Sequence, residues 1–213
     1  MQDRLDSRVT EPRPLLLCGF GAFPEVPDNP TERVIERLDR SGWTPQGGAL
    51  STHVAPVSWS RAYDSLVGAA RQASACAVLL TGVAVKATRF RVELRAQNRA
   101  NGKRPDVDGR THSGARITRF GPSVARATAP AAGLLRALRD EGLEAETSSD
   151  AGDYLCNYAL YRLLTEAFDH PSAPQVGFLH VPASATADEA ERGMKAAATA
   201  FLKALAKPVA VAV

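Results

Sequence analysis

One continuous apolar run decides the fold class: Ala75-Cys-Ala-Val-Leu-Leu-Thr81, which ends at Gly82. The run has no polar alternation, as is typical of a strand that is buried on both faces of a parallel sheet. Before it, residues 60–73 have apolar side chains at helical spacing. After it, residues 88–98 alternate apolar and charged side chains, which predicts a strand with one polar face.

The same alternation of strands and helices extends to both ends of the chain. We expect further strands at residues 14–20, 50–57, 143–147 and 175–181. We expect further helices at residues 30–40, 129–141, 153–168 and 186–205. Residues 100–114 are polar and predict a long loop that could fold over a site. This order predicts an α/β fold, a three-layer α/β/α sandwich around a mostly parallel mixed sheet, in a single domain over residues 14–213.

Composition excludes several classes of protein. With 213 residues, 45% of them hydrophobic, the chain can bury one sizeable core, and a net charge of +3 gives no support for nucleic-acid binding. No apolar run approaches the roughly 20 residues of a membrane helix. Residues 1–13 are polar and carry both signs of charge, so we expect a frayed tail in a cytoplasmic protein. Three widely spaced cysteines fit neither a disulfide framework nor a zinc site, so we expect no metal and no cofactor.

Cys156 has the setting of a nucleophile. It follows an expected strand and falls in the first turn of the next helix, with Asp150 or Asp153 as the possible N-cap. If Asp153 is the cap, Cys156 is the third helical residue, where free N–H groups and the helix dipole stabilise a thiolate. The alternative is a small apolar residue on a buried helix face. Cys18 and Cys76 lie in apolar strands and are expected in the core.

A cysteine nucleophile needs a base within hydrogen-bond reach, and His180 is the best placed histidine. It lies near the end of the strand that follows the Cys156 helix, and the carboxyl ends of parallel strands share one edge of the sheet. A core histidine is the alternative. His170 follows a helix end, which favours a structural role, and no partner is visible in the sequence for His53 or His112.

A third group should orient the imidazole, a role for aspartate, glutamate or asparagine. Glu93 is one candidate among many. Its place between Arg91 and Arg95 in an alternating strand favours a surface carboxylate instead.

Four blocks of the sequence carry a family resemblance. The first is Gly19-Phe20-Gly-Ala-Phe23 with Asn29-Pro30, and the second runs from Gly82-x-Ala84 through Glu93, Ala96 and Asn98 to Pro105-Asp106 and Gly109. The third is Ala151-Gly-Asp-Tyr-Leu-Cys156-Asn157-Tyr158, and the fourth is Gly177-Phe-Leu-His180-Val181-Pro182. In this order they resemble pyroglutamyl-peptidase I, the pyrrolidone-carboxylate peptidases, which remove an amino-terminal 5-oxoproline from peptides. The resemblance extends from about residue 15 to residue 205.

The resemblance implies a catalytic triad of Cys156, His180 and Glu93. It implies a substrate pocket in which Phe20 and Phe23 help to enclose the oxoproline ring, with further lining and electrostatic support from Val83, Leu155 and Lys103. An apolar pocket is what a small neutral lactam needs. It also implies a peptide substrate with an N-terminal pyroglutamate and a homo-oligomer, a dimer or a tetramer.

The chain departs from the family pattern on loops that are expected to shape the pocket. The family's Gly-Gly-Arg stretch is Val85-Lys86-Ala87, and its Pro-Phe-Gly is Ala22-Phe23-Pro24. Val83 stands where many members carry a glutamine that contacts pyroglutamate. The arginine two residues before the family's Pro-Asp falls on Lys103, which keeps the charge but loses the bidentate fork.

Together these observations predict a cysteine exopeptidase that hydrolyses N-terminal pyroglutamate through a thioester, with oxyanion donors at the start of the Cys156 helix. Two alternatives stay open. One is a related Cys-His-Glu amidohydrolase that acts on another acyl group, and the other is a non-catalytic ligand-binding protein that keeps the fold. A nucleoside-phosphorylase-like function shares the architecture, but the sequence has no Gly-rich phosphate loop.

Overall fold

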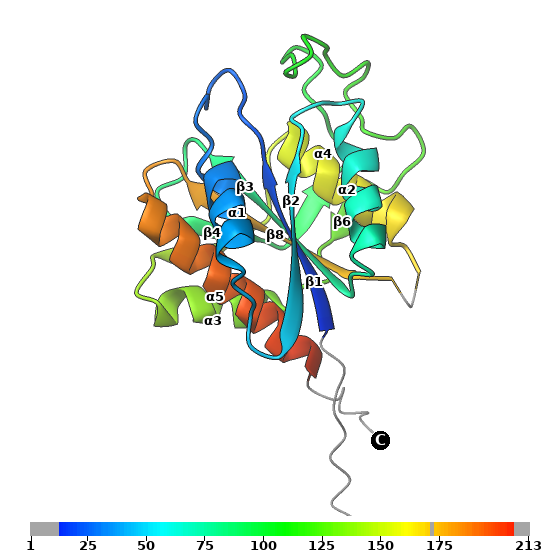
Figure 1. The fold of residues 1–213 in the computed structure, drawn as a ribbon. Helices are drawn as coiled ribbons and strands as arrows, with labels where there is room; N and C mark the ends of the chain where they lie inside the picture. Colours follow the sequence, from blue (N-terminus) through cyan, green and yellow to red (C-terminus); the bar gives the residue numbers. More distant parts are fainter. Residues whose placement is uncertain (1–12, 171–172, 207–213) are drawn as a thin grey trace, which may run out of the picture.

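The computed structural model describes residues 13–170 and 173–206, which form a central sheet between two layers of helices (Figure 1). The expected tail at residues 1–13 lies outside the described residues except for Arg13, which begins the first strand. Within the described residues no helix combines the length and apolarity needed to cross a membrane.

The sheet is mixed and mostly parallel, as predicted. Its strand order is β2-β1-β3-β8-β4-β7. The four parallel strands are β1 (Arg13–Phe20), β2 (Gly48–Ala55), β3 (Ala77–Ala84) and β8 (Gln175–Pro182). β4 (Phe90–Glu93) runs antiparallel to β8, and β7 (Ala145–Ser148) pairs parallel with β4. β3 lies between β1 and β8 and is buried along nearly its whole length, which explains its continuous apolar sequence.

Each face of the sheet packs against its own group of helices. One apolar core joins the sheet to α2 (Ala62–Gln72), α4 (Leu155–Arg162) and the π-helical turn η1 (Leu163–Ala167). The other joins it to α1 (Pro30–Ser41), α3 (Ala131–Asp140) and α5 (Ala187–Ala206). The three-layer α/β/α prediction is therefore confirmed.

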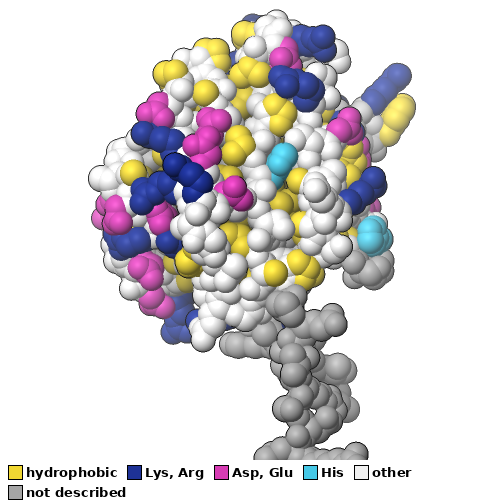
Figure 2. Space-filling view, in the orientation of Figure 1, with side chains coloured by type: hydrophobic (Ala, Val, Ile, Leu, Met, Phe, Trp, Pro, Cys, Tyr) yellow, Lys and Arg dark blue, Asp and Glu magenta, His cyan; other side chains and the backbone are white. Residues whose placement is uncertain are grey.

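The charged surface over α1, α3 and α5 is mixed in sign. Figure 2 shows Lys and Arg side chains interspersed with Asp and Glu on this face. Arg37 and Lys195 both pair with Glu191, and Arg192 pairs with Asp188. Exposed pairs of this kind contribute little to stability, and this face offers no continuous basic patch for a nucleic acid.

The single strand predicted for residues 88–98 is wrong. β4 ends at Glu93, and residues 95–97 form β5 (Arg95–Gln97), which pairs antiparallel with β6 (Val124–Arg126) in a separate two-stranded sheet. At the break, Leu94 donates to the carbonyl of Ser148 and accepts from the amide of Ala127, and its side chain is 38% exposed. Pairing with segments far along the chain therefore overrides the local alternation. The three-residue β6 is too short to give a sequence signal.

The long loop between β5 and β6 is held by two buried polar side chains from the second sequence block. Asp106 accepts hydrogen bonds from the backbone amides of Trp59, Asp108 and Arg110. Asn98 accepts from the amide of Thr118 and donates to two carbonyl groups of the same loop. The loop is therefore anchored to the domain although it has no regular secondary structure.

Candidate active site

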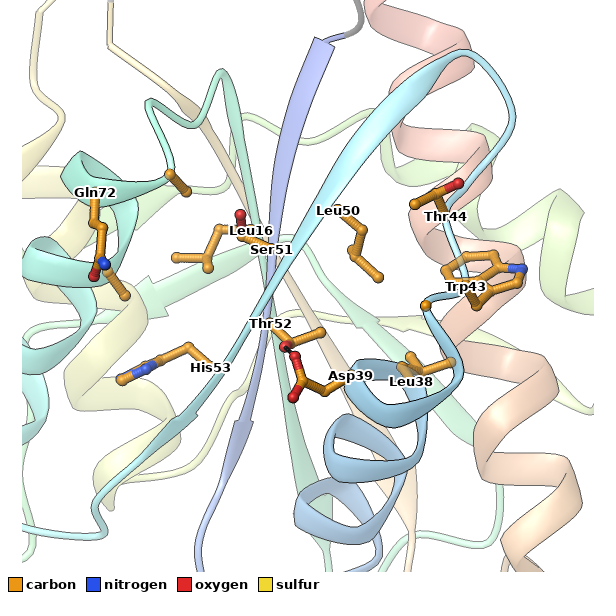
Figure 3. Close-up of a pocket in the computed structure, with 13 residues that line it drawn as sticks. Leu16, Leu38, Asp39, Trp43, Thr44, Leu50, Ser51, Thr52, His53 and Gln72 are labelled. Atoms are coloured by element: carbon orange, nitrogen blue, oxygen red, sulfur yellow. Dashed lines mark hydrogen bonds between the residues drawn. The ribbon is translucent and has the colours of Figure 1, made fainter.

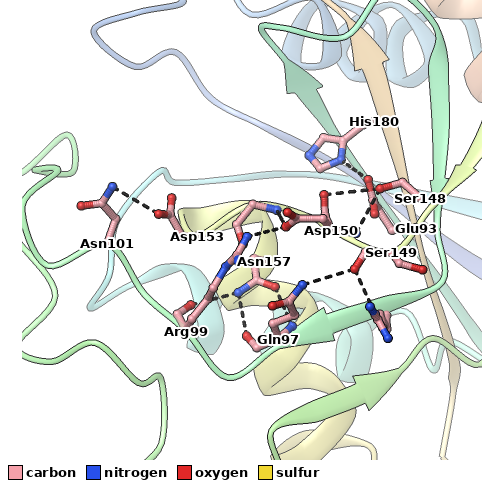
Figure 4. Close-up of polar contacts among 12 residues, drawn as sticks. Glu93, Gln97, Arg99, Asn101, Ser148, Ser149, Asp150, Asp153, Asn157 and His180 are labelled. Atoms are coloured by element: carbon pink, nitrogen blue, oxygen red, sulfur yellow. Dashed lines mark hydrogen bonds and ion pairs between the residues drawn. The ribbon is translucent and has the colours of Figure 1, made fainter.

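His180 and Glu93 face each other across β8 and β4. The Nδ1 of His180 lies 2.8 Å from the Oε1 of Glu93, and the two residues are 5% and 1% exposed (Figure 4). The surface position favoured for Glu93 is wrong, because β4 is an interior strand with a neighbour on each side. The second carboxylate oxygen of Glu93 is buried with no hydrogen-bond partner in the described part of the chain. His180 is therefore the hydrogen-bond partner of the Glu93 side chain in this part of the structure.

Cys156 lies in the first turn of α4. The helix begins at Leu155, and its N-cap is Tyr154, which makes no side-chain capping bond. The predicted caps are wrong because both carboxylates are engaged elsewhere: Asp150 accepts from Gly152 and Arg99, and Asp153 from Asn101. Cys156 is consequently the second helical residue and keeps the first-turn setting, with backbone N–H groups that lack intrahelical partners.

The thiol of Cys156 packs directly over Gly82 of β3. A Cβ atom at Gly82 would lie 2.8 Å from the Sγ of Cys156 and 3.0 Å from the ring of Phe178. Gly82 is the register partner of His180 on the adjacent strand. Cys156 and Glu93 both raise the pKa of His180, and Cys156 and His180 line the same cavity, so the thiol and the carboxylate both lie near the imidazole.

The strand direction that brings Cys156 close to His180 differs from the one expected. The position expected for His180 requires the strand before Cys156 to run parallel to β8. β7 instead runs opposite to β8, because it pairs parallel with the antiparallel strand β4. The segment from Ser149 to Tyr154 then leads from the end of β7 to α4, beside His180.

The electrostatics of the site favour a protonated His180. Burial opposes its charged form, but the hydrogen bonds and charges of Cys156 and Glu93 outweigh burial and raise the pKa of His180 to about 9. At neutral pH the imidazole therefore carries a proton between two potential anions. Burial raises the pKa of the thiols of Cys18 and Cys76, which keeps both protonated. Cys18 lies in the core as expected, but the core position expected for Cys76 is wrong, because Cys76 is only partly buried just before β3.

A cavity of about 520 Å³ opens beside Cys156 and His180. All four substrate-binding residues implied by the resemblance line it: Phe20, Phe23, Val83 and Leu155. The site thus combines a reachable thiol, a protonated imidazole and an apolar wall, and this combination suits acyl transfer from a small, uncharged acyl group.

Comparison with known proteins agrees with this chemistry. A family model described as "Pyroglutamyl peptidase" matches residues 13–213. The chain belongs to the pyroglutamyl peptidase family. The pyrrolidone-carboxylate peptidase of Oceanobacillus iheyensis is 32% identical over 80% of this chain and 84% of its own length. That of Deinococcus radiodurans is 33% identical over 80% of this chain and 78% of its own length.

Solved structures of the family have the same fold. The pyrrolidone carboxyl peptidase from Thermococcus litoralis superposes with a TM-score of 0.82 at 27% identity, covering 90% of this chain and 94% of that protein. The enzyme from Thermus thermophilus gives a TM-score of 0.77 at 28% identity, covering 87% of this chain and 98% of that protein.

Lys103 does not take the place that the family resemblance implies. Its side chain is exposed in a turn, where its amide donates to the side chain of Asn101, and it does not line the cavity. The next residue, Arg104, lines the cavity instead. Arg104 faces the cavity and Lys103 faces solvent, so the cation expected beside the substrate lies one position later in the sequence.

Sequence reasoning also missed a role for Asn157. Its buried side chain accepts from the amide of Gln97 and donates to the carbonyls of Gln97 and Arg99 (Figure 4). These bonds attach α4, immediately after the nucleophile position, to β5. The signal was present in the sequence, because an asparagine directly after Cys156 belongs to the third block.

The other histidines lie away from this cavity or serve the loop. His53 lines a second cavity of about 510 Å³ beside the edge strand β2 (Figure 3). It hydrogen-bonds Ser65 at 2.7 Å. His112 bonds the carbonyl of Gly114 and packs edge-on against Trp59. Both therefore have partners that the sequence did not reveal.

Proposed function

We propose that this protein is a cysteine exopeptidase that hydrolyses the bond after an N-terminal pyroglutamate. The observation that carries the proposal is the position of His180, which bonds Glu93 and lines the same cavity as Cys156, where Phe20, Phe23 and Leu155 form an apolar wall. This arrangement has the nucleophile, base and orienting group of cysteine acyl transfer.

The reaction follows from the three side chains. The Cys156 thiolate, beside the protonated His180, attacks the carbonyl carbon that joins 5-oxoproline to the next residue. The C–N bond then breaks, and His180 gives its proton to the leaving amine, which leaves a thioester. A water molecule, deprotonated by His180, attacks the thioester, and the C–S bond breaks to release 5-oxoproline and to restore the thiolate beside the protonated His180.

The start of α4 supplies the donors for the negative oxygen that forms in each step. Because Tyr154 caps the helix without a side-chain bond, the amides of the first turn remain available beside Cys156. Donors of this kind are typically worth ~10²–10³ in rate.

The chemistry of the cavity explains why a lactam would be selected. The amino group of pyroglutamate is sealed in the ring, so the acyl group is small and uncharged. Phe20, Phe23 and Leu155 offer it an apolar surface. Two carboxylates, Asp150 and Asp153, also line the cavity, but they bond Arg99 and Asn101. Because both are already engaged, we expect peptides with a free N-terminus to be rejected.

The experiment that tests the proposal measures release of a fluorescent amine from pyroglutamyl and prolyl amides. Wild type should cleave the pyroglutamyl amide selectively, and Cys156→Ser and His180→Ala should abolish turnover. Cys76→Ser is the matched control, because this thiol lies outside the cavity and bonds the carbonyl of Pro14. Activity that survives Cys156→Ser would overturn the proposal.

A related amidohydrolase with another acyl specificity is the second candidate, favoured by the branched apolar side chain of Val83 in the cavity wall. Absence of pyroglutamyl turnover, with rapid alkylation of Cys156 near neutral pH, would identify it. An unreactive Cys156 in a folded protein would instead identify a ligand-binding protein without catalysis.

We further propose a cytoplasmic homo-oligomer, a dimer or a tetramer. The three cysteines are free, which suits a reducing compartment. The side chain of Phe120 is 89% exposed, with Val107 and Val124 also exposed in or beside the same loop, and apolar exposure of this kind suits a subunit contact. Light scattering of the purified chain tests the assembly, and a monomer at micromolar concentration would contradict it.

A further inference from the structure

Arg104 joins three segments that are far apart in the sequence. The carbon at the centre of its guanidinium group lies 3.8 Å from the ring centroid of Tyr154 and 5.6 Å from that of Phe23. Its Nε lies 3.1 Å from the Oε1 of Glu25. Arg104 belongs to the loop between β5 and β6, Phe23 and Glu25 to the loop between β1 and α1, and Tyr154 to the cap of α4.

All three segments border the candidate active site. Phe23, Arg104 and Tyr154 line the same cavity as Cys156. The rings of Phe23 and Tyr154 are 6.3 Å apart, and the hydroxyl of Tyr154 donates to the carbonyl of Pro105, next to Arg104. One wall of the cavity is therefore built from contacts that converge on Arg104.

The loop that carries Phe23 has little regular structure of its own to hold that ring in place. A two-bond bridge between Phe23 and Val26 is its local backbone pairing. The hydrogen bond from Arg104 lowers the pKa of Glu25, which keeps that carboxylate charged and paired. A planar guanidinium can stack on an aromatic face and bond a carboxylate at its edge at the same time, whereas an ammonium group has no plane to stack on the ring.

We propose that Arg104 is a positioning residue that clamps Phe23 against Tyr154 and so sets the affinity of the cavity for the acyl group. The inference rests on the proposed function, because it assigns Phe23 to the wall around that group. Arg104 acts through Phe23 and Tyr154, and the bond between His180 and Glu93 does not involve it.

The kinetic test compares Arg104→Ala and Arg104→Lys with wild type on a pyroglutamyl amide. Arg104→Ala should raise KM about three- to tenfold, the scale of one exposed ion pair with one cation–π contact. The value of kcat should stay within about twofold. Arg104→Lys should fall between the two proteins, because it keeps the charge and loses the stacked plane. Glu25→Gln should also raise KM, by less than Arg104→Ala.

Arg119→Ala is the matched control. Arg119 belongs to the same loop and its guanidinium lies over the ring of Phe120, but it does not line the cavity. This variant should leave KM and kcat unchanged. A fall in kcat with an unchanged KM in Arg104→Ala would overturn the proposal, because it would place Arg104 in the chemical step.

Hydrogen–deuterium exchange of the peptide that covers residues 21–27 provides a readout independent of catalysis. Arg104→Ala should speed exchange of the Phe23 and Val26 amides, and Arg119→Ala should not. If Arg104→Ala leaves the exchange of these amides unchanged, the proposal that Arg104 clamps Phe23 is overturned. If wild type fails to cleave any pyroglutamyl amide, the proposed function fails, while the exchange result still decides whether Arg104 holds the Phe23 loop.

Discussion

Gly82 lies directly beneath the thiol of Cys156, so close that a methyl group in place of its hydrogen would be 2.8 Å from the Sγ. The φ angle of Gly82 is not positive, so the position needs glycine for space and not for backbone conformation. The side chain of Cys156 thus packs against Gly82 near the end of β3.

We expect Gly82→Ala to displace the thiol and to lower kcat by about 10²-fold, because small misplacements of a reacting group have large kinetic effects. Steady-state kinetics and the rate of Cys156 alkylation measure the effect. Gly68→Ala is the matched control, because nothing lies within 4 Å of a Cβ at that position of α2. It should keep full activity and stabilise the helix by about 0.5–1 kcal/mol. Equal activity in both variants would contradict the packing of Cys156 on Gly82.

The pH dependence of kcat/KM should report the proton on His180. Because the pKa of His180 is raised to about 9, the imidazolium needed to protonate the leaving amine is present below that pH and is lost above it. Activity should therefore fall on the alkaline side near pH 9. Glu93→Gln removes a charge that raises this pKa, so the alkaline limb should move toward neutral pH. A limb at the same pH in wild type and Glu93→Gln would show that Glu93 does not act on His180.

Asn157→Ala should destabilise the protein by about 1–3 kcal/mol, because it leaves backbone groups of Gln97 and Arg99 without the buried side chain that bonds them. Urea unfolding monitored by fluorescence measures the change in free energy. Asn157→Asp keeps the acceptor for Gln97 and loses both donors, so we also expect it to be destabilised. Asn101→Ala, which removes a partly exposed side chain, is the control and should cost less than about 1 kcal/mol. Equal losses at the two positions would contradict the role of Asn157.

Val83→Gln tests the departure from the family pattern in the cavity wall. The resemblance places a pyroglutamate-contacting amide at this position, and Val83 lines the cavity. An added hydrogen bond to the lactam should raise kcat/KM for pyroglutamyl amides by about two- to tenfold. Val83→Met, which adds length without a polar group, is the control. A gain in both variants, or a loss in Val83→Gln, would show that Val83 suits a different acyl group.

Much of the fold follows from local patterns. The central strand β3 is recognisable because burial on both faces demands a continuous apolar run, and α3 is recognisable because Gly142, with a φ of +73°, lies just beyond its end. Patterns of this kind involve residues within one turn or one strand, so they can be recognised in the sequence before the fold is known.

Other features depend on contacts between distant segments. Glu93 looks like a surface residue in its alternating sequence, and it is buried because β4 lies between β8 and β7. Asp150 and Asp153 look like helix caps, but both have partners more than 50 residues earlier in the chain. Which of Lys103 and Arg104 reaches the cavity depends on the turn before Pro105, which charge alone does not specify.

By itself, the sequence determined the α/β class, the order of most strands and helices, and the choice of Cys156 and His180 as a candidate pair, because periodicity and position along the chain are local properties. The tertiary structure decided that β4 and β7 run against the other strands, that Glu93 faces His180, and that Arg104 joins Phe23 to Tyr154. These relationships come from strand pairing and packing between segments far apart in the chain, and no short stretch of sequence contains both partners.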